Sequence, residues 1–293
     1  MRRPQEIDKE RVAMSSIVQL TGAFEGIASA HIARIKTQVQ QSELFFKELW
    51  ATYTALRVGK EFHSGHTAKG VQIQKELVIL ITAEGSLSGD IDQRLIESVL
   101  GIYKKDTHDL IVVGHHGSVL LDQRKITPLQ KFRLPEQGNE ASVVEPIVEE
   151  VQKYSSATVY YQAYLSLMSQ EVKSIQLSTV VQERGESLEE SGELEGLITD
   201  VNFIFEPSVP AVIDYMEQSM LGVALSEVIM ESKLAQQASR FRAMSAARSR
   251  AKETEEDLRL QYNHAGRTIK DERTKEIVSS ILHSKTKKRR LLI

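Results

Sequence analysis

The sequence contains no cysteine, which excludes disulfide bonds, thiolate metal sites and cysteine nucleophiles. It has no run of eighteen or more apolar residues, so no membrane-spanning helix is predicted. The first residues, MRRPQEIDKERVAM, lack an apolar core, so no signal peptide is predicted either. Aromatic residues make up only 6% of the 293 residues, which favours slender helices over a thick core. The net charge of −3 gives no overall attraction to nucleic acid.

A long helical pattern lies near the C-terminus. From about residue 208 to residue 282 the chain is almost free of proline and glycine, and apolar side chains recur every three or four positions. The clearest of these are Leu234, Ala238, Phe241, Leu258, Tyr262, Ala265 and Ile269. At 1.5 Å per residue the run predicts a rod of roughly 110 Å.

Residues 5–58 have the same character. Their predicted apolar stripe consists of Ile17, Leu20, Phe24, Ile27, His31, Ile35, Val39, Phe46 and Leu49. Gly22 and Gly26, one turn apart, would allow another rod to approach closely, and the lone His31 is interpreted as a packed stripe residue. Because an apolar stripe must be buried, the two terminal helices are predicted to form a long antiparallel coiled coil.

The pattern changes between these helices. Strands are predicted at residues 76–82, 109–114, 158–167, 172–178 and 198–206, and helices at residues 90–104 and 141–154. Residues 60–70 and the acidic segment 183–196 are interpreted as loops, and residues 118–140 as a short strand with loops. The fold class is therefore α/β, with a Rossmann-like, largely parallel domain (70–207) inserted into a coiled-coil axle (1–58 and 208–293).

Candidate chemistry is sparse. The turn from Gly85 to Gly89 follows a strand and precedes a helix, where phosphate-binding loops lie, but it lacks the lysine of a P-loop. Leu87 stands where a nucleophile elbow needs serine, so a plain tight turn is favoured. His108, His115 and His116 are interpreted as surface loop residues. No catalytic residue, cofactor or metal site is predicted.

Two basic segments leave alternatives open. The first comprises Arg240, Arg242, Arg248, Arg250 and Lys252, followed at once by acidic residues. It suits either a solvated helix or a positive collar that meets acidic loops of a partner. The second, residues 285–290, suits either a solubilising terminus or contact with nucleic acid or anionic lipid.

Several segments together resemble the gamma subunit of rotary ATP synthases. The C-terminal helix has the family's order and spacing at residues 225–228 (LSEV), 232–235 (SKLA), 238–244 (ASRFRAM), 262–263 (YN) and 276–278 (EIV). Residues 20–28 (LTGAFEGIA) and the turn at residues 83–89 (AEGSLSG) are similar to the family's N-terminal segment and first turn. The resemblance covers the chain to about residue 282.

The resemblance implies a non-catalytic rotor. The rod would be an axle inside a ring of alternating alpha and beta subunits, and the α/β domain would dock the epsilon subunit and grip the membrane ring of c subunits. The protein would be peripheral on the cytoplasmic face of a bacterial membrane, reaching the membrane only through partners, without cofactors and without direct nucleic-acid contact. It would transmit torque between proton-driven transport and ATP synthesis or hydrolysis.

The resemblance also implies contact residues. Arg240 matches the family's arginine on the C-terminal helix, and Phe24 takes the place of its partner methionine. Contacts with the catalytic ring are expected at Phe24, Arg240, Arg242, Met244, Arg248 and Arg250, and a stalk-domain turn at Gly85, Leu87 and Gly89. Three alternatives are a rotor of a related motor that hydrolyses ATP for another purpose, a coiled-coil adaptor or nucleic-acid-binding protein, and a Rossmann-like enzyme.

Overall fold

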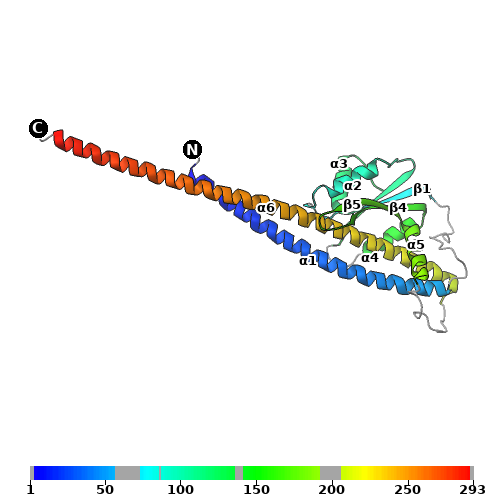
Figure 1. The fold of residues 1–293 in the computed structure, drawn as a ribbon. Helices are drawn as coiled ribbons and strands as arrows, with labels where there is room; N and C mark the ends of the chain where they lie inside the picture. Colours follow the sequence, from blue (N-terminus) through cyan, green and yellow to red (C-terminus); the bar gives the residue numbers. More distant parts are fainter. Residues whose placement is uncertain (1–2, 57–72, 86, 136–140, 192–205, 291–293) are drawn as a thin grey trace. The chain divides into compact units, whose positions relative to one another are not determined.

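The computed structural model describes residues 3–56, 73–85, 87–135, 141–191 and 206–290. Helix α1 (Pro4–Leu56) begins the described chain, and helix α6 (Val209–Arg290) ends it (Figure 1). The chain divides into two compact units, residues 27–243 and residues 1–26 with 244–293. Both long helices therefore contribute to both units. The backbone of the basic segment 285–290 belongs to α6, and its side chains lie outside the described residues.

The larger unit contains a five-stranded sheet in the order β3-β2-β1-β4-β5. Its strands are β1 (Ile73–Ile81), β2 (His108–Val113), β3 (Gln130–Phe132), β4 (Tyr154–Tyr164) and β5 (Gln170–Gln176). Its shorter helices are α2 (Ile91–Leu100), α3 (His115–Gln123), α4 (Ala141–Val151) and α5 (Leu177–Glu190). The pairs β1–β2, β1–β4 and β2–β3 are parallel, and β4–β5 is antiparallel. The predicted α/β class with a largely parallel sheet is confirmed.

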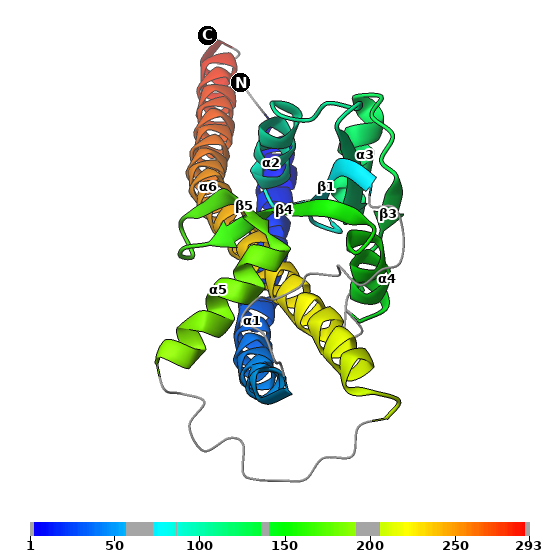
Figure 2. The same ribbon diagram turned by 90° about the vertical axis from the view of Figure 1, so that its right-hand side faces the viewer.

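Both faces of the sheet are covered, which explains the unbroken apolar runs of its central strands. On β1, Val78 and Leu80 pack with residues of α2 and α3 on one face. Leu77, Ile79 and Ile81 pack on the other face with α4 and with the nearby parts of α1 and α6 (Figures 1 and 2). Alternate residues of one strand thus serve two separate cores.

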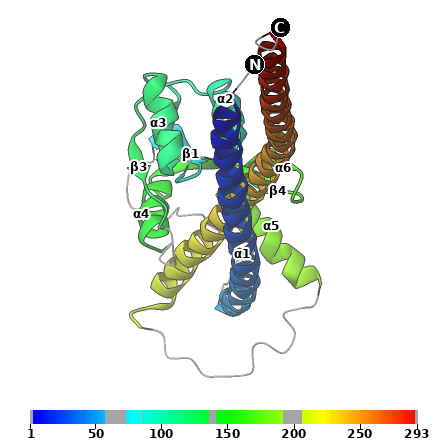
Figure 3. The same cartoon turned by 90° about the vertical axis from the view of Figure 1, so that its left-hand side faces the viewer.

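Helix α6 crosses α1 within the larger unit (Figures 2 and 3). The contact is an apolar cluster of Ile32, Ile35, Met230, Leu234 and Ala238. Tyr53 of α1 adds a buried hydrogen bond, because its hydroxyl donates to Glu217 of α6 at 2.9 Å.

The smaller unit is a pair of helical segments. Ile7 of α1 packs with Leu258 and Ala265 of α6, and Glu25 of α1 pairs with Arg248 of α6 at 3.0 Å. Because the residue numbers rise on one helix as they fall on the other, the two segments are antiparallel. The predicted pairing of the two terminal helices is confirmed within each unit.

The predicted stripe on the first half of α1 is wrong at three positions, whereas its members Phe24 and His31 are half-buried and Ile35 is buried. The buried or half-buried positions recur every seven residues, which is the coiled-coil repeat: Ile7, Met14, Thr21, Ala28 and Ile35. Ile17, Leu20 and Ile27 are instead 41%, 61% and 52% exposed. The prediction chose the large apolar side chains, whereas the packed positions include the small residues Ala28 and Thr21. The hydroxyl of Thr21 donates to the carbonyl of Ile17 at 2.7 Å, so it can be buried. On α6, Tyr262 and Ile269 are likewise exposed.

Two segments expected to be irregular are helical. Residues 118–123 belong to α3, and the acidic residues 183–190 belong to α5 (Figure 2). The loop interpretation of α5 was wrong because its inner face, with Leu177 and Val181 buried, carries enough apolar contact to hold a surface rich in glutamate. The expected loop at 60–70 and residues 198–205 of the expected strand at 198–206 lie outside the described residues.

Candidate functional site

The carboxyl ends of β1 and β4 form the crevice where doubly wound sheets usually bind ligands. The strand order turns back there, since β2 and β3 lie on one side of β1 and β4 on the other. In this chain α6 lies against the crevice. The hydroxyl of Ser239 donates to the carbonyl of Ser88 at 2.6 Å, and a β-carbon added to Gly89 would lie 3.7 Å from the same hydroxyl. Helix α6 therefore occupies the position in the crevice where related sheets bind a ligand.

The turn between β1 and α2 is shaped by this contact. Leu87 and Gly89 both have left-handed backbones, with φ of 74° and 73°. A leucine rarely adopts this conformation, and here its side chain is half exposed. Gly85 lies beside the guanidinium of Arg240, because a β-carbon added there would be 3.4 Å from Nη2. The turn thus displays Leu87 outward and meets α6 with its glycines.

Asp92 is the centre of a buried hydrogen-bond network at the crevice. Its carboxylate is fully buried and accepts a bond from Nε2 of Gln162 at 2.7 Å and a longer one from the backbone N–H of Ala83 at 3.3 Å. Nδ1 of His116 lies 2.7 Å from its other oxygen. This hydrogen bond with Asp92 raises the pKa of His116 above 6.5, against the opposing effect of burial.

The interpretation of the histidines as loop residues was wrong, although His115 is exposed as expected. His115 and His116 begin α3, and His108 lies in β2, where Nε2 is 3.5 Å from a carboxylate oxygen of Glu76. Asp92 and His116 are 24 residues apart, and no local pattern links them. The one available signal is general: an acidic residue in the first turn of a helix that follows a buried strand lies at the ligand-binding end of the sheet.

Arg240 and Arg242 are anchored to the larger unit. Burial lowers the pKa of Arg240, and the nearby carboxylate of Asp92 opposes that effect. Nη1 of Arg242 donates to the carbonyl of Met168 at 2.9 Å, in the turn between β4 and β5. Of the arginines expected at a partner contact, Arg242 therefore also holds a loop of its own chain, and Arg240 lies half-buried beside the turn at Gly85.

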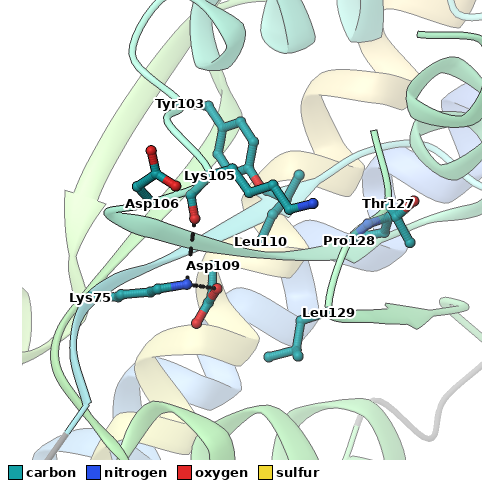
Figure 4. A pocket seen from close by; sticks show the side chains of 9 residues that line it. All are labelled: Lys75, Tyr103, Lys105, Asp106, Asp109, Leu110, Thr127, Pro128 and Leu129. Carbon is teal, nitrogen blue, oxygen red and sulfur yellow. Dashed lines mark hydrogen bonds and ion pairs between the residues drawn. The ribbon is translucent and has the colours of Figure 1, made fainter. Parts of the chain in front are cut away.

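A cavity of about 430 Å³ lies at the opposite, amino-terminal edge of the strands (Figure 4). Nζ of Lys75 is already bonded to Asp109 at 3.1 Å and to the carbonyl of Lys105 at 3.4 Å. Tyr103, Leu110 and Leu129 contribute ring and aliphatic surface. Lys75 is thus held by groups of the lining itself, and we assign no reaction to the cavity.

The described ranges contain neither a candidate membrane span nor a candidate metal site. No helix there is both long and apolar enough to cross a bilayer. In the same residues, no three histidine, aspartate or glutamate side chains gather as metal ligands would.

The model of the family described as ATP synthase matches residues 4–281 of the chain. This chain belongs to the ATP synthase gamma chain family. The ATP synthase gamma chain of Streptococcus suis is 23% identical over 289 residues, with 94% of this chain and 96% of the relative covered. That of Prosthecochloris aestuarii is 25% identical, with 91% and 93% covered. The low identity marks a divergent member.

Solved structures share the fold of this gamma-family chain. One is a chain in the cryo-EM structure of the Euglena gracilis mitochondrial ATP synthase (OSCP/F1/c-ring, rotational state 3), with a TM-score of 0.61, 13% identity and 94% of each chain covered. Another is from the Tetrahymena thermophila central stalk and c-ring, with a TM-score of 0.54, 17% identity, 78% of this chain and 99% of that chain covered. At these identities the likeness concerns the fold.

The other residues expected at the gamma family's ring contact lie in the smaller unit. Phe24 is half-buried, Met244 is buried and Arg250 is exposed. Arg248 pairs with Glu25, and Gly22 makes room for it, since an added β-carbon would lie 3.3 Å from the guanidinium carbon. Contact of these residues with a catalytic ring stays a prediction.

Proposed function

We propose that this gamma-family chain is the central rotor of an ATP synthase, turning inside the ring of alpha and beta subunits. The observation that carries the proposal is a second apolar surface on α1. The helix buries one stripe against α6 and leaves Ile17 and Leu20 exposed beside it. A helix pair with spare apolar surface suits enclosure by a partner.

Torque transmission follows from asymmetry. In the smaller unit α1 presents apolar side chains, whereas α6 presents the exposed charges of Arg248, Arg250, Lys252 and Glu253. Three otherwise equal sites around such a rotor would meet different surfaces at each angle. Rotation would then change their nucleotide affinities in turn, which is differential binding coupled to a mechanical coordinate.

The larger unit is the proposed attachment to the rest of the rotor, namely the epsilon subunit and the c ring. The chain would reach the cytoplasmic face of a bacterial membrane only through these partners. The crevice that could hold a small molecule in related sheets is in contact with α6, which supports a mechanical role and not a catalytic one.

Affinity purification of a tagged chain from the cells that produce it tests the proposal. We expect alpha, beta, epsilon and c subunits to co-purify in one complex. A nucleotide-hydrolysing ring without c subunits would instead assign the chain to a related motor. Salt-sensitive binding of nucleic acid without any ring would refute the rotor assignment.

A further inference from the structure

A continuous chain of polar side chains links α3 to α6 through the interior of the larger unit. His116 bonds to Asp92, and Asp92 accepts from Gln162 of β4, as described above. The hydroxyl of Ser232 on α6 then donates to Oε1 of Gln162 at 3.0 Å. Nε2 of Gln236, one turn further along α6, donates to the Ser232 hydroxyl at 3.0 Å.

The buried part of this hydrogen-bond network depends on the protonation state of one half-exposed residue, His116. Asp92, Gln162 and Ser232 are almost completely buried, whereas the His116 side chain is 29% exposed and can exchange protons with solvent. A buried carboxylate is tolerated when it is paired and hydrogen-bonded, and removing a charged partner is costly. When His116 loses its proton, the Asp92 carboxylate therefore loses a charged partner, and because it is buried, water cannot replace that partner.

The ionisable groups at the His116–Asp92 pair belong to helices α2, α3 and α6, and neutral groups complete its surroundings. Asp92 faces His116 from α2, and Arg240 of α6 interacts electrostatically with Asp92. β4 contributes the neutral Gln162, and the segment after β1 contributes the carbonyl of Ala83, which accepts a hydrogen bond from the His116 backbone N–H at 2.9 Å. His115 is the titratable neighbour on α3 itself, and it is exposed.

We propose that His116 and Asp92 form a proton-sensitive clasp that holds α6 in the crevice of the sheet and tightens as the pH falls. When His116 is protonated, its bond to Asp92 is charge-assisted and roughly twice as strong as a neutral one. That bond fixes the carboxylate to which Gln162 is attached, and Gln162 in turn holds Ser232 of α6. The clasp thus acts on α6 through three successive hydrogen bonds.

The direction of the pH effect follows from linkage. The folded pKa of His116 is raised above 6.5. The stabilisation is therefore complete below the unfolded value and is lost as the pH rises through the higher folded value. The inference concerns this chain alone. Only its mechanical consequence, a looser grip between the sheet and α6 at alkaline pH, rests on the proposed rotor function.

Hydrogen exchange of the full chain between pH 6 and pH 9 tests the clasp, with rates corrected for intrinsic exchange. We expect the protection of amides at residues 229–236 to fall at least threefold across this range in the wild type. His116→Gln keeps a neutral donor for Asp92 but cannot titrate, so its protection is expected to change less with pH than that of the wild type. His115→Gln, at the exposed neighbour, is the matched control and should behave like the wild type.

A histidine-selective NMR titration supplies the second measurement. Asp92→Asn should lower the titration midpoint of His116 below its wild-type position, because only the opposing effect of burial remains. The proposal is overturned if wild type and His116→Gln show the same pH dependence of protection, or if His115→Gln abolishes it. If Asp92→Asn does not fold, the exchange comparison of the two histidine variants decides alone.

Discussion

Gly185 of α5 packs directly against the indole ring of Trp50 of α1, and a β-carbon added to the glycine would overlap the ring. The contact is part of a wider attachment of α5. Arg184 lies over the ring of Phe46, 4.0 Å from its centroid, and forms an ion pair with Glu227 of α6. Nε1 of Trp50 donates to Glu189 at 3.1 Å. Helix α5 therefore ties α1 and α6 together in the larger unit.

We predict that Gly185→Ala destabilises the larger unit, although alanine favours helix. The loss from overpacking against Trp50 should be about 1–3 kcal/mol in the free energy of unfolding. The matched control is Gly222→Ala in α6, where an added β-carbon would be in ordinary contact with Val144 at 3.6 Å. Urea unfolding should show this control unchanged or more stable. Equal stability for both variants would contradict the packing.

The same helix shows what the sequence could and could not predict. The strands of the sheet and the two long helices follow from runs and periodicity, which are local signals. Helix α5 was missed because its acidic surface outweighed an inner face of few apolar residues, whose partners Phe46 and Trp50 are more than 130 residues away. The network around Asp92 was missed for the same reason, since it joins α2, α3, β4 and α6.

The packed and exposed positions of α1 make a second prediction. Ile7→Ala removes a side chain that is 3% exposed and should cost about 2–4 kcal/mol of local stability. Leu20→Ala, at a position 61% exposed, should change stability by less than about 0.5 kcal/mol. Thermal unfolding measures both. If Leu20 instead proved as costly as Ile7, the stripe identified from the sequence would be the packed one.

The half-buried Glu231 gives a prediction on pH. Burial raises the pKa of Glu231 above 4.5, although Tyr161 and Lys173 oppose this effect. Its contribution to stability is therefore present at acidic pH and lost as the pH rises through the folded value. Glu231→Gln should be more stable than the wild type at pH 8, with a difference that shrinks toward pH 4. Urea unfolding at both pH values measures it, and a constant difference would contradict the assignment.

The absence of native cysteine permits a clean test of the helix pairing in the smaller unit. We expect the double variant Ile7→Cys with Leu258→Cys to be linked by a short bismaleimide, because the two side chains belong to one apolar cluster. Val12→Cys with Leu258→Cys is the control, since Val12 is 51% exposed on α1. Intact mass after limited proteolysis between the helices reports the link. Linking of the control pair alone would show a different register.

Single-molecule rotation tests the rotor function most directly. A bead is fixed to the larger unit of this chain, and a ring of the alpha and beta subunits from the same cells is fixed to glass. On addition of ATP we predict rotation of the bead in one direction, with hydrolysis that depends on the presence of the chain. A ring that binds this chain and hydrolyses ATP while the bead stays still would contradict the rotor assignment.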